Sequence, residues 1–254
     1  ASAQVAISEF VSSGIGDGWW DKMEGIYGLY GGTAESTAIN WKNPGTHDIE
    51  WSGNITFSDE GVRSTDFTGR GILNGLTYGD GESLEYSDAH FSTYVCEGNA
   101  ISNKNRGIIW IGAVGQTHVT NWDKGPAFLM DWFGGGSSGN VESHFSSTIR
   151  ETKSNDEGRN HIFYIGECSN MDESLIVNGT VVDHTELESH TYGTLGSGVE
   201  VKLLAGDLTL NDDYVTMPSN DLHGFFSAGY SLTEAETVSF NKAVHKLMQA
   251  LGRE

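Results

Sequence analysis

The sequence contains few prolines, few cysteines and few basic residues. Its 254 residues include 3 Pro, 2 Cys and 14 Lys and Arg, against 34 Gly and 35 Asp and Glu. The resulting formal net charge of −21 repels phosphate backbones and argues against nucleic-acid binding. No apolar run approaches the roughly 18 residues of a membrane-spanning helix. The N-terminal stretch also has no basic region ahead of an apolar core, so neither membrane insertion nor a signal peptide is expected.

Common metal and catalytic motifs are missing as well. The two cysteines, Cys96 and Cys168, do not have the C-x-x-C spacing of a metal site. One disulfide and two separate buried thiols both remain open for them. The sequence has no GxxxxGK[ST] phosphate loop, no G-x-S-x-G nucleophile elbow and no HExxH zinc motif.

From about residue 36 onward the sequence has the pattern of a β protein. Short apolar runs alternate with turn residues, as in IEWSGNITFS, RGIIWIGAVG, AFLMDWFGG, HIFYIGECS and VEVKLLAGDL. The segment SLIVNGTVVDH predicts a hairpin because Asn178-Gly179 fits a type I′ turn. About eight to ten such strands with no helical pattern between them predict an all-β antiparallel sandwich.

Helical patterns are confined to the two ends of the chain. Residues 3–30 look like a helical segment interrupted by glycines, and we assign residues 1–35 to it. Near the other end, Thr233 and Glu236 have the spacing of a capping box. An apolar stripe follows at helical spacing, formed by Phe240, Val244, Leu247, Met248 and Leu251. We therefore expect a sandwich over residues 36–254 with a closing helix at 233–251.

Four segments occur in an order that resembles a known family. They are GWWDKMEGIYGLY with STAINWKNPG, NITFSDEGVRSTDFTG, IFYIGECSNMDESLIVNGTVV, and FFSAGYSLTEAE with its helix. Over residues 5–252 the chain resembles concanavalin-A-like, laminin-G-type jelly-roll domains of tailed phages, prophages and gene-transfer-agent-like particles. Many of those sequences end in F-x-x-G-R-x-L-T-x-A-E, whereas Tyr230 stands here in place of the Arg. No role of that Arg is carried over.

The resemblance implies a non-enzymatic protein on the surface of a virion. We expect a head spike, a head decoration or a tail-fibre component that binds cell-surface polysaccharide, in many copies or as a homo-oligomer with other virion proteins. One alternative is a purely structural virion module, whose mark is an exposed apolar patch, with the N-terminal helix as the candidate. The others are a capsule or exopolysaccharide depolymerase and a cellular lectin unconnected with phage. Fold does not decide among them.

Exposed tryptophans are the candidate sugar contacts. Trp122 lies in the polar stretch THVTNWDKG between Asn121 and Asp123, and Trp132 beside a glycine run is second. An aromatic platform flanked by polar groups is typical of sugar sites. Trp110, in an apolar run, is expected in the core, and Trp19–Trp20 in helix packing.

Calcium is the one cofactor candidate, because related lectins and laminin-G domains hold it with loop oxygens. The candidate ligands are Asn211, Asp212 and Asp213, with the Asp80-Gly81-Glu82 loop second. The alternating run HTELESH, starting at His184, could also ligate a divalent metal.

A glycosidase needs two carboxylates at a fixed separation. The nearest approaches are Asp48 with Glu50 and Glu186 with Glu188. Neither pair has the supporting pattern of aromatic residues that a sugar-cleaving site uses, so an enzyme is not expected.

Overall fold

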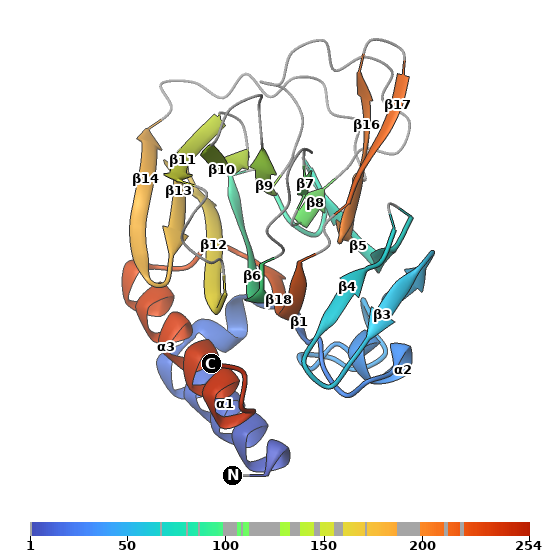
Figure 1. Ribbon diagram of the computed structural model, residues 1–254. Helices are drawn as coiled ribbons and strands as arrows, with labels where there is room; N and C mark the ends of the chain where they lie inside the picture. The colour runs from blue at the N-terminus through green and yellow to red at the C-terminus, as the bar shows by residue number, and fades with distance from the viewer. Residues whose placement is uncertain are drawn as a thin grey trace.

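The computed structural model is an antiparallel β-sandwich with helices packed on one side (Figure 1). It describes residues 2–254 except 67, 80, 86, 99–105, 108, 112–127, 133–137, 145–147, 155–159, 171, 187–198, 211–212 and 219–220. The described residues form eighteen strands, more than the eight to ten that the sequence suggested, because several apolar runs are split by turns. The prediction of an all-β sandwich of jelly-roll type is confirmed.

The largest sheet has eight strands in the order β14-β13-β12-β6-β18-β4-β3, with β1 also paired to β18. Its strands are antiparallel neighbours throughout. Their bounds are β1 Met23–Gly28, β3 Ile55–Phe57, β4 Val62–Ser64, β6 Asp88–Glu97, β12 Ile162–Ser169, β13 Asp172–Val177, β14 Thr180–Glu186 and β18 Leu222–Gly229.

Two four-stranded sheets and a hairpin make up the remaining β-structure. One sheet is ordered β2-β5-β15-β8, with β2 Ile49–Ser52, β5 Arg70–Tyr78, β15 Val199–Leu203 and β8 Ile109–Ile111. The other is ordered β11-β10-β9-β7, with β11 Thr148–Ser154, β10 Ser138–His144, β9 Phe128–Trp132 and β7 Arg106–Gly107. The hairpin joins β16 Ala205–Leu210 to β17 Asp213–Pro218. For β7–β11, β16 and β17 the backbone alone is described.

The predicted hairpin after β13 is confirmed. Asn178 and Gly179 have φ values of 48° and 78°, so both central residues are left-handed, as a type I′ turn requires. The strands on either side pair as Val177 with Thr180.

The helices are α1 Ala3–Asp17, the 3₁₀ turn η1 Trp19–Lys22, the short α2 Ala34–Ala38 and α3 Glu234–Ala250. The capping box of α3 is confirmed, with Thr233 and Glu236 each accepting a hydrogen bond from the other's backbone N–H. The helical assignment of residues 3–30 was wrong from Met23 to Gly28. That stretch is β1, because its backbone pairs with β18 and its apolar residues fill both faces of the sheet.

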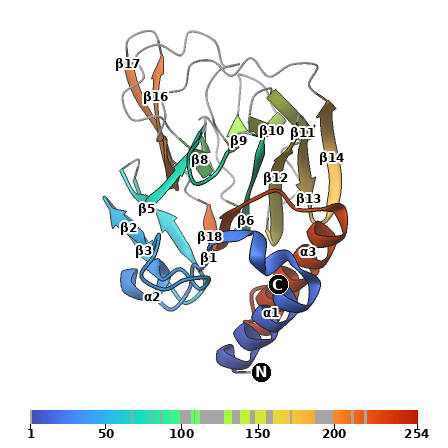
Figure 2. The same cartoon turned by 180° about the vertical axis from the view of Figure 1, so that it is seen from behind.

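The eight-stranded sheet has a buried core on each face. The sandwich core lies between this sheet and the sheet β2-β5-β15-β8, and Phe91, Tyr164 and Phe226 are among its fully buried aromatic side chains. The helical core lies on the opposite face, where α1, η1 and α3 cover the strands. Figure 2 shows these helices side by side below the sandwich, with the N-terminal end of α1 projecting away from it.

Aromatic rings hold the helical core together. Phe240 of α3 lies with its ring centroid 4.9 Å from Trp19, 5.5 Å from Phe163 and 6.1 Å from Phe225. The expectation that Trp19 packs with the helices is therefore confirmed, and Trp20 lies partly buried beside it.

The cysteine question is resolved in favour of two buried thiols. Cys96 belongs to the helical core and Cys168 to the sandwich core, so the sheet separates them and they form no disulfide. Burial raises the pKa of the Cys96 thiol to about 12, which keeps it protonated.

Candidate functional site

The first predicted sugar contacts, Asn121, Trp122 and Asp123, lie outside the described residues. Trp132 is the last residue of β9, where its backbone pairs with Asn140 of β10. Trp110 lies in β8, opposite Lys202 of β15. The sugar-contact assignments of Trp122 and Trp132 and the core assignment of Trp110 therefore stay predictions.

Of the predicted calcium ligands, the structure describes only the backbone of Asp213, at the start of β17. Leu210 pairs with Asp213, and Asn211 and Asp212 between them lie outside the described residues. The assignment of Asn211, Asp212 and Asp213 as calcium ligands therefore stays a prediction. Of the second candidate, Glu82 accepts a hydrogen bond from Thr77 at 2.8 Å, and Asp80 is outside the described part.

The HTELESH run is only partly described. His184 lies exposed on β14, with its Nδ1 3.3 Å from the Ser174 hydroxyl, and Glu186 ends that strand. Glu188 and His190 lie beyond the described residues. In the part of the chain that is described, no three His, Cys, Asp or Glu side chains are grouped closely enough to hold a metal ion.

The Asp48–Glu50 pair is not arranged for glycoside hydrolysis. The Asp48 carboxylate accepts hydrogen bonds from the backbone N–H groups of Asn40 and Gly45, at 2.9 and 3.2 Å, and so fixes the loop before β2. Glu50 is exposed on β2. Asp48 therefore has a structural role.

A more organised set of carboxylates lies where β6 and β12 meet the connection from β18 to α3. Asp88 Oδ1 accepts hydrogen bonds from the Ser231 backbone N–H at 2.8 Å and from the Ser231 hydroxyl at 2.6 Å. Glu167 accepts from the Leu232 N–H at 3.1 Å and from the Thr237 hydroxyl at 3.4 Å. The two carboxylates thus anchor the start of α3.

Glu167 is nearly buried, and its charge is disfavoured there. Burial raises the pKa of Glu167 to about 7, and the nearby Glu236 and Asp88 carboxylates add to this shift. The two hydrogen bonds to Glu167 act in the opposite direction and limit the rise of its pKa. A carboxyl group with a pKa near 7 could serve as a general acid, but here its oxygens are occupied by α3.

A buried hydrogen-bond chain runs beside Glu167. His90 Nδ1 lies 2.6 Å from the Tyr230 carbonyl oxygen and therefore donates to it. Its Nε2 then accepts from the Ser227 hydroxyl at 3.2 Å, and Ser92 lies 2.7 Å from Ser227. Burial lowers the pKa of His90 to about 4. A neutral His beside a Ser resembles a catalytic pair, but His90, Ser92 and Ser227 are fully buried.

The accessible part of this junction is the surface around Tyr230. Its side chain is partly exposed at the end of β18, and its backbone N–H donates to the Lys22 carbonyl oxygen at 2.8 Å. Partial burial raises the pKa of Tyr230, and the carboxylates of Glu24, Asp88 and Glu85 raise it further. These four residues, named here the Tyr230 surface, combine one partly exposed phenol ring with three nearby carboxylates, of which Glu24 accepts a hydrogen bond from the Tyr230 hydroxyl and Asp88 accepts from Ser231.

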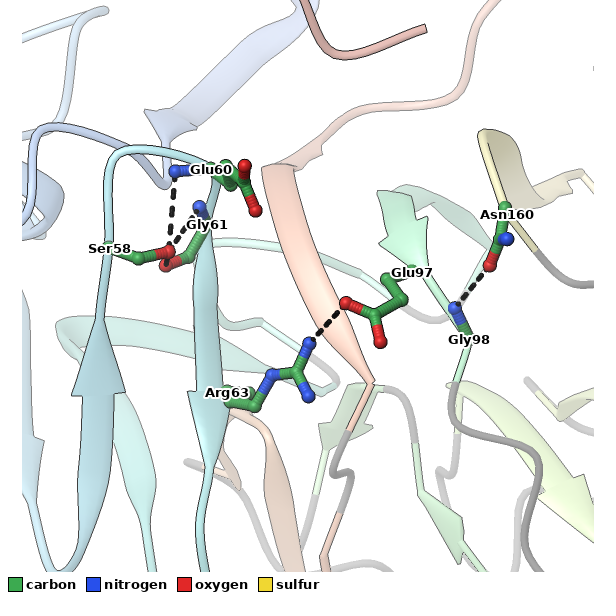
Figure 3. A network of polar contacts seen from close by, with 7 residues as sticks. All are labelled: Ser58, Glu60, Gly61, Arg63, Glu97, Gly98 and Asn160. Atoms are coloured by element: carbon green, nitrogen blue, oxygen red, sulfur yellow. Dashed lines mark hydrogen bonds and ion pairs between the residues drawn. The ribbon is translucent and has the colours of Figure 1, made fainter.

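A second polar network lies at the opposite end of β6 (Figure 3). Arg63 of β4 forms an ion pair with Glu97 at 2.8 Å, and the Gly98 N–H donates to Asn160 at 3.1 Å. The Ser58 hydroxyl accepts from the N–H groups of Glu60 and Gly61 and closes the β3–β4 turn. These contacts tie neighbouring strands together, so we assign the network a structural role.

The outer side of the helical layer carries two open hollows. One, of about 540 Å³, is lined by residues of α1 and by Lys246. The other, of about 670 Å³, lies between the C-terminal half of α1 and the first turns of α3. None of the helices in the described part of the chain is long and apolar enough to cross a membrane.

Sequence reasoning missed the Tyr230 surface. Its residues come from β1, the segment before β6, β6 and the end of β18, which are far apart in the sequence. No motif in the sequence marked these four residues as a group.

No family model and no curated protein matches this sequence. Solved structures match its fold at low identity. Domain 4 of AbnA, an extracellular GH43 arabinanase from Geobacillus stearothermophilus in complex with arabinotriose, is 10% identical with a TM-score of 0.53, over 86% of this chain and 98% of that one. A binding domain of botulinum neurotoxin DC in complex with SialylT is 13% identical with a TM-score of 0.51, over 88% and 52% of the two chains.

A Trypanosoma rangeli sialidase in complex with 2,3-difluorosialic acid is 9% identical with a TM-score of 0.58. That match covers 91% of this chain but only 33% of the sialidase. At these identities the likeness concerns the fold alone.

Proposed function

We propose that this protein binds carbohydrate and that it does so as a surface component of a phage or phage-like particle. In this proposal it is a head spike, a head decoration or a tail-fibre part that attaches to host cell-surface polysaccharide without cleaving it. Two matched structures of the same fold carry a sugar ligand in their descriptions, arabinotriose and SialylT, which supports a carbohydrate partner. The virion setting is supported by the order of sequence segments described above.

The observation that carries the proposal is the Tyr230 surface. A partly exposed tyrosine ring offers a flat apolar face to a pyranose or furanose ring. The exposed Glu85 carboxylate near it can accept hydrogen bonds from sugar hydroxyls, whereas Glu24 and Asp88 already accept from the Tyr230 and Ser231 hydroxyls. Trp122 with Asn121 and Asp123 is the second predicted contact.

Binding by such an open surface is expected to be weak per site. Many copies on one particle would engage one polysaccharide together, and linked sites raise the overall avidity by about 10²–10⁴ without a new contact. Strong attachment is therefore compatible with a shallow site.

The test is binding of the purified chain to an array of bacterial glycans, in calcium and then in a chelator. We expect binding to specific glycans that is weakened by Tyr230→Ala or by Trp122→Ala. Loss on chelation alone would move the site to an acidic loop such as residues 211–213. No binding in either buffer would contradict the proposal.

A second candidate function is a structural virion module that binds other virion proteins. The specific observation in its favour is apolar exposure on the N-terminal helix, where Val5 and Ile15 are 47% and 64% exposed. Incorporation into particles by a chain that binds no glycan would favour this alternative.

The depolymerase alternative has the weaker support. Asp88 and Glu167 are the organised carboxylates of the described residues, and both hold α3 in place. Release of reducing ends from a bound capsule polysaccharide would nevertheless favour an enzyme over a binding protein.

A further inference from the structure

The outer face of α1 lacks the charges that a solvent-facing helix normally carries. Ala6, Phe10 and Gly14 face the core, and the opposite side presents Val5, Ser8, Ser12 and Ile15. Glu9 and Asp17 are its two charged residues, in a chain of net charge −21. The outer face of α1 is therefore weakly charged, with Ser8 and Ser12 between the exposed apolar side chains of Val5 and Ile15.

Exposed apolar side chains are concentrated on this helical layer. Five large apolar side chains are well exposed in the described part of the chain, and three of them are Val5 and Ile15 on α1 and Val238 on α3. The two open hollows lie on the same layer, so its surface is uneven as well as apolar.

The distribution of basic residues singles out the same layer. Among the Lys and Arg side chains that the structure describes, Lys242 and Lys246 of α3 are the exposed ones, and the others are partly or fully buried. Both line the larger hollow, together with Asp17 and Glu234. Lys246 also forms an ion pair with Glu9 at 2.9 Å. This layer therefore carries charges of both signs on an otherwise acidic molecule.

We propose that the outer face of α1 and α3 is an interface at which two copies of this chain pack about a two-fold axis. In such an interface the same patch meets itself, so ion pairs across it require acidic and basic groups on that one patch. Asp17 and Glu234 of one copy can then face Lys242 and Lys246 of the other. The apolar residues of α1 would fill the space between the helix pairs.

A second copy fits this face better than an unrelated acidic partner. Repulsion between two molecules of charge −21 opposes contact everywhere except where the local charges balance. The helical layer meets that condition and also offers apolar area. The remaining surface, including the Tyr230 surface, would stay open on both copies.

The test is sedimentation velocity of the purified chain over a range of concentrations at physiological salt. We expect a reversible dimer with twice the chain mass of 27.5 kDa. Ile15→Lys should raise the dimer dissociation constant by at least about tenfold, because a charge would enter an apolar contact. Ile15 is 64% exposed, so the variant should fold, which circular dichroism checks.

The matched control is Val181→Lys on β14. Val181 is 57% exposed on the edge strand β14 and lines neither hollow, and its replacement changes the net charge equally. It should leave the dissociation constant unchanged. A chain that stays monomeric at all concentrations, or a dimer that Ile15→Lys and Val181→Lys affect equally, would overturn the inference. Either result is independent of glycan binding.

Discussion

The two cores on either face of the eight-stranded sheet differ in the elements that cover them. Strand β6 contributes to both, with Ala89 and Phe91 in the sandwich core and His90 and Tyr94 on the helical side. The sandwich core is closed by a second sheet, whose backbone hydrogen bonds are made within the sheet. Helices close the other side, and the free N–H groups at the start of α3 need partners. The capping box supplies a partner for the Glu236 N–H, and Glu167 accepts from the N–H of Leu232 just before the helix.

The difference teaches that apolar packing and polar anchoring act together on the helical side. Aromatic rings provide the buried area, and hydrogen bonds that join Tyr230, Ser231, Leu232 and Thr237 to the side chains of His90, Asp88 and Glu167 fix where α3 begins. The following predictions separate these contributions, from the largest expected effect to the smallest.

Removing the central ring of the helical core should have the largest effect. Phe240 is fully buried among Trp19, Phe163 and Phe225. We expect Phe240→Ala to lower the free energy of unfolding by about 3–5 kcal/mol. Val238→Ala, at a position 38% exposed on the same helix, should change it by less than about 0.5 kcal/mol. Urea unfolding measures both, and equal effects would show that the helical core contributes little.

The buried histidines and Glu167 should change the free energy of unfolding in opposite directions as the pH falls. Burial lowers the pKa values of His90 and His223 to about 4, so the stability from these neutral rings is present above pH 6.5 and lost as the pH falls toward 4. Burial raises the pKa of Glu167 to about 7, so its contribution is present below pH 4.5 and lost as the pH rises through 7. The two histidines together outweigh the one glutamate, and the protein should be less stable in acid.

The variant Glu167→Gln removes the ionisation of Glu167 and leaves that of the two histidines. Without the gain from protonating Glu167, the fall in the free energy of unfolding from pH 7.5 to 4.5 should be steeper than in the parent chain, by on the order of 3 kcal/mol. Urea unfolding of both proteins at the two pH values tests this. Parallel pH profiles would mean that Glu167 is not buried as the structure describes.

The capping box should contribute a smaller amount. Thr233 accepts a hydrogen bond from the Glu236 N–H at 3.3 Å, and Thr233→Ala removes it. A loss of about 1 kcal/mol is expected. Thr233→Ser keeps the acceptor and serves as the control, and an equal loss in both variants would contradict a capping role.

The smallest effect concerns the Tyr230 surface. Tyr230→Arg would place a cation among Glu24, Glu85 and Asp88. We expect a stabilisation of at most about 1 kcal/mol that disappears at high salt, because the site is partly exposed. A destabilised variant would show that the phenol ring packs more tightly than its exposure indicates. Thermal unfolding at low and high salt distinguishes these results.

Much of the fold could be predicted from local signals. Asn178-Gly179 fixed one hairpin and Thr233 with Glu236 fixed the start of α3, because both depend on neighbouring residues. Strand β1 was missed because its pairing with β18 joins opposite ends of the chain. Since β1 is buried on both faces, it also lacks the alternation that marks a half-exposed strand.

The candidate site was harder to predict for the same physical reason. Tyr230, Glu24, Glu85 and Asp88 meet only through sheet pairing, and no spacing in the sequence links them. Aromatic type and polar neighbours pointed instead to Trp122, which lies outside the described residues.

The central claim, carbohydrate binding by this sandwich, is tested most directly by titrating a glycan selected on the array into the parent chain and into the Tyr230→Ala/Trp122→Ala double variant. Isothermal titration calorimetry should give saturable binding to the parent chain and a dissociation constant at least about tenfold higher for the folded double variant. Equal affinity in the two proteins would contradict both assigned contacts, and the absence of binding to the parent chain would contradict the proposed function itself.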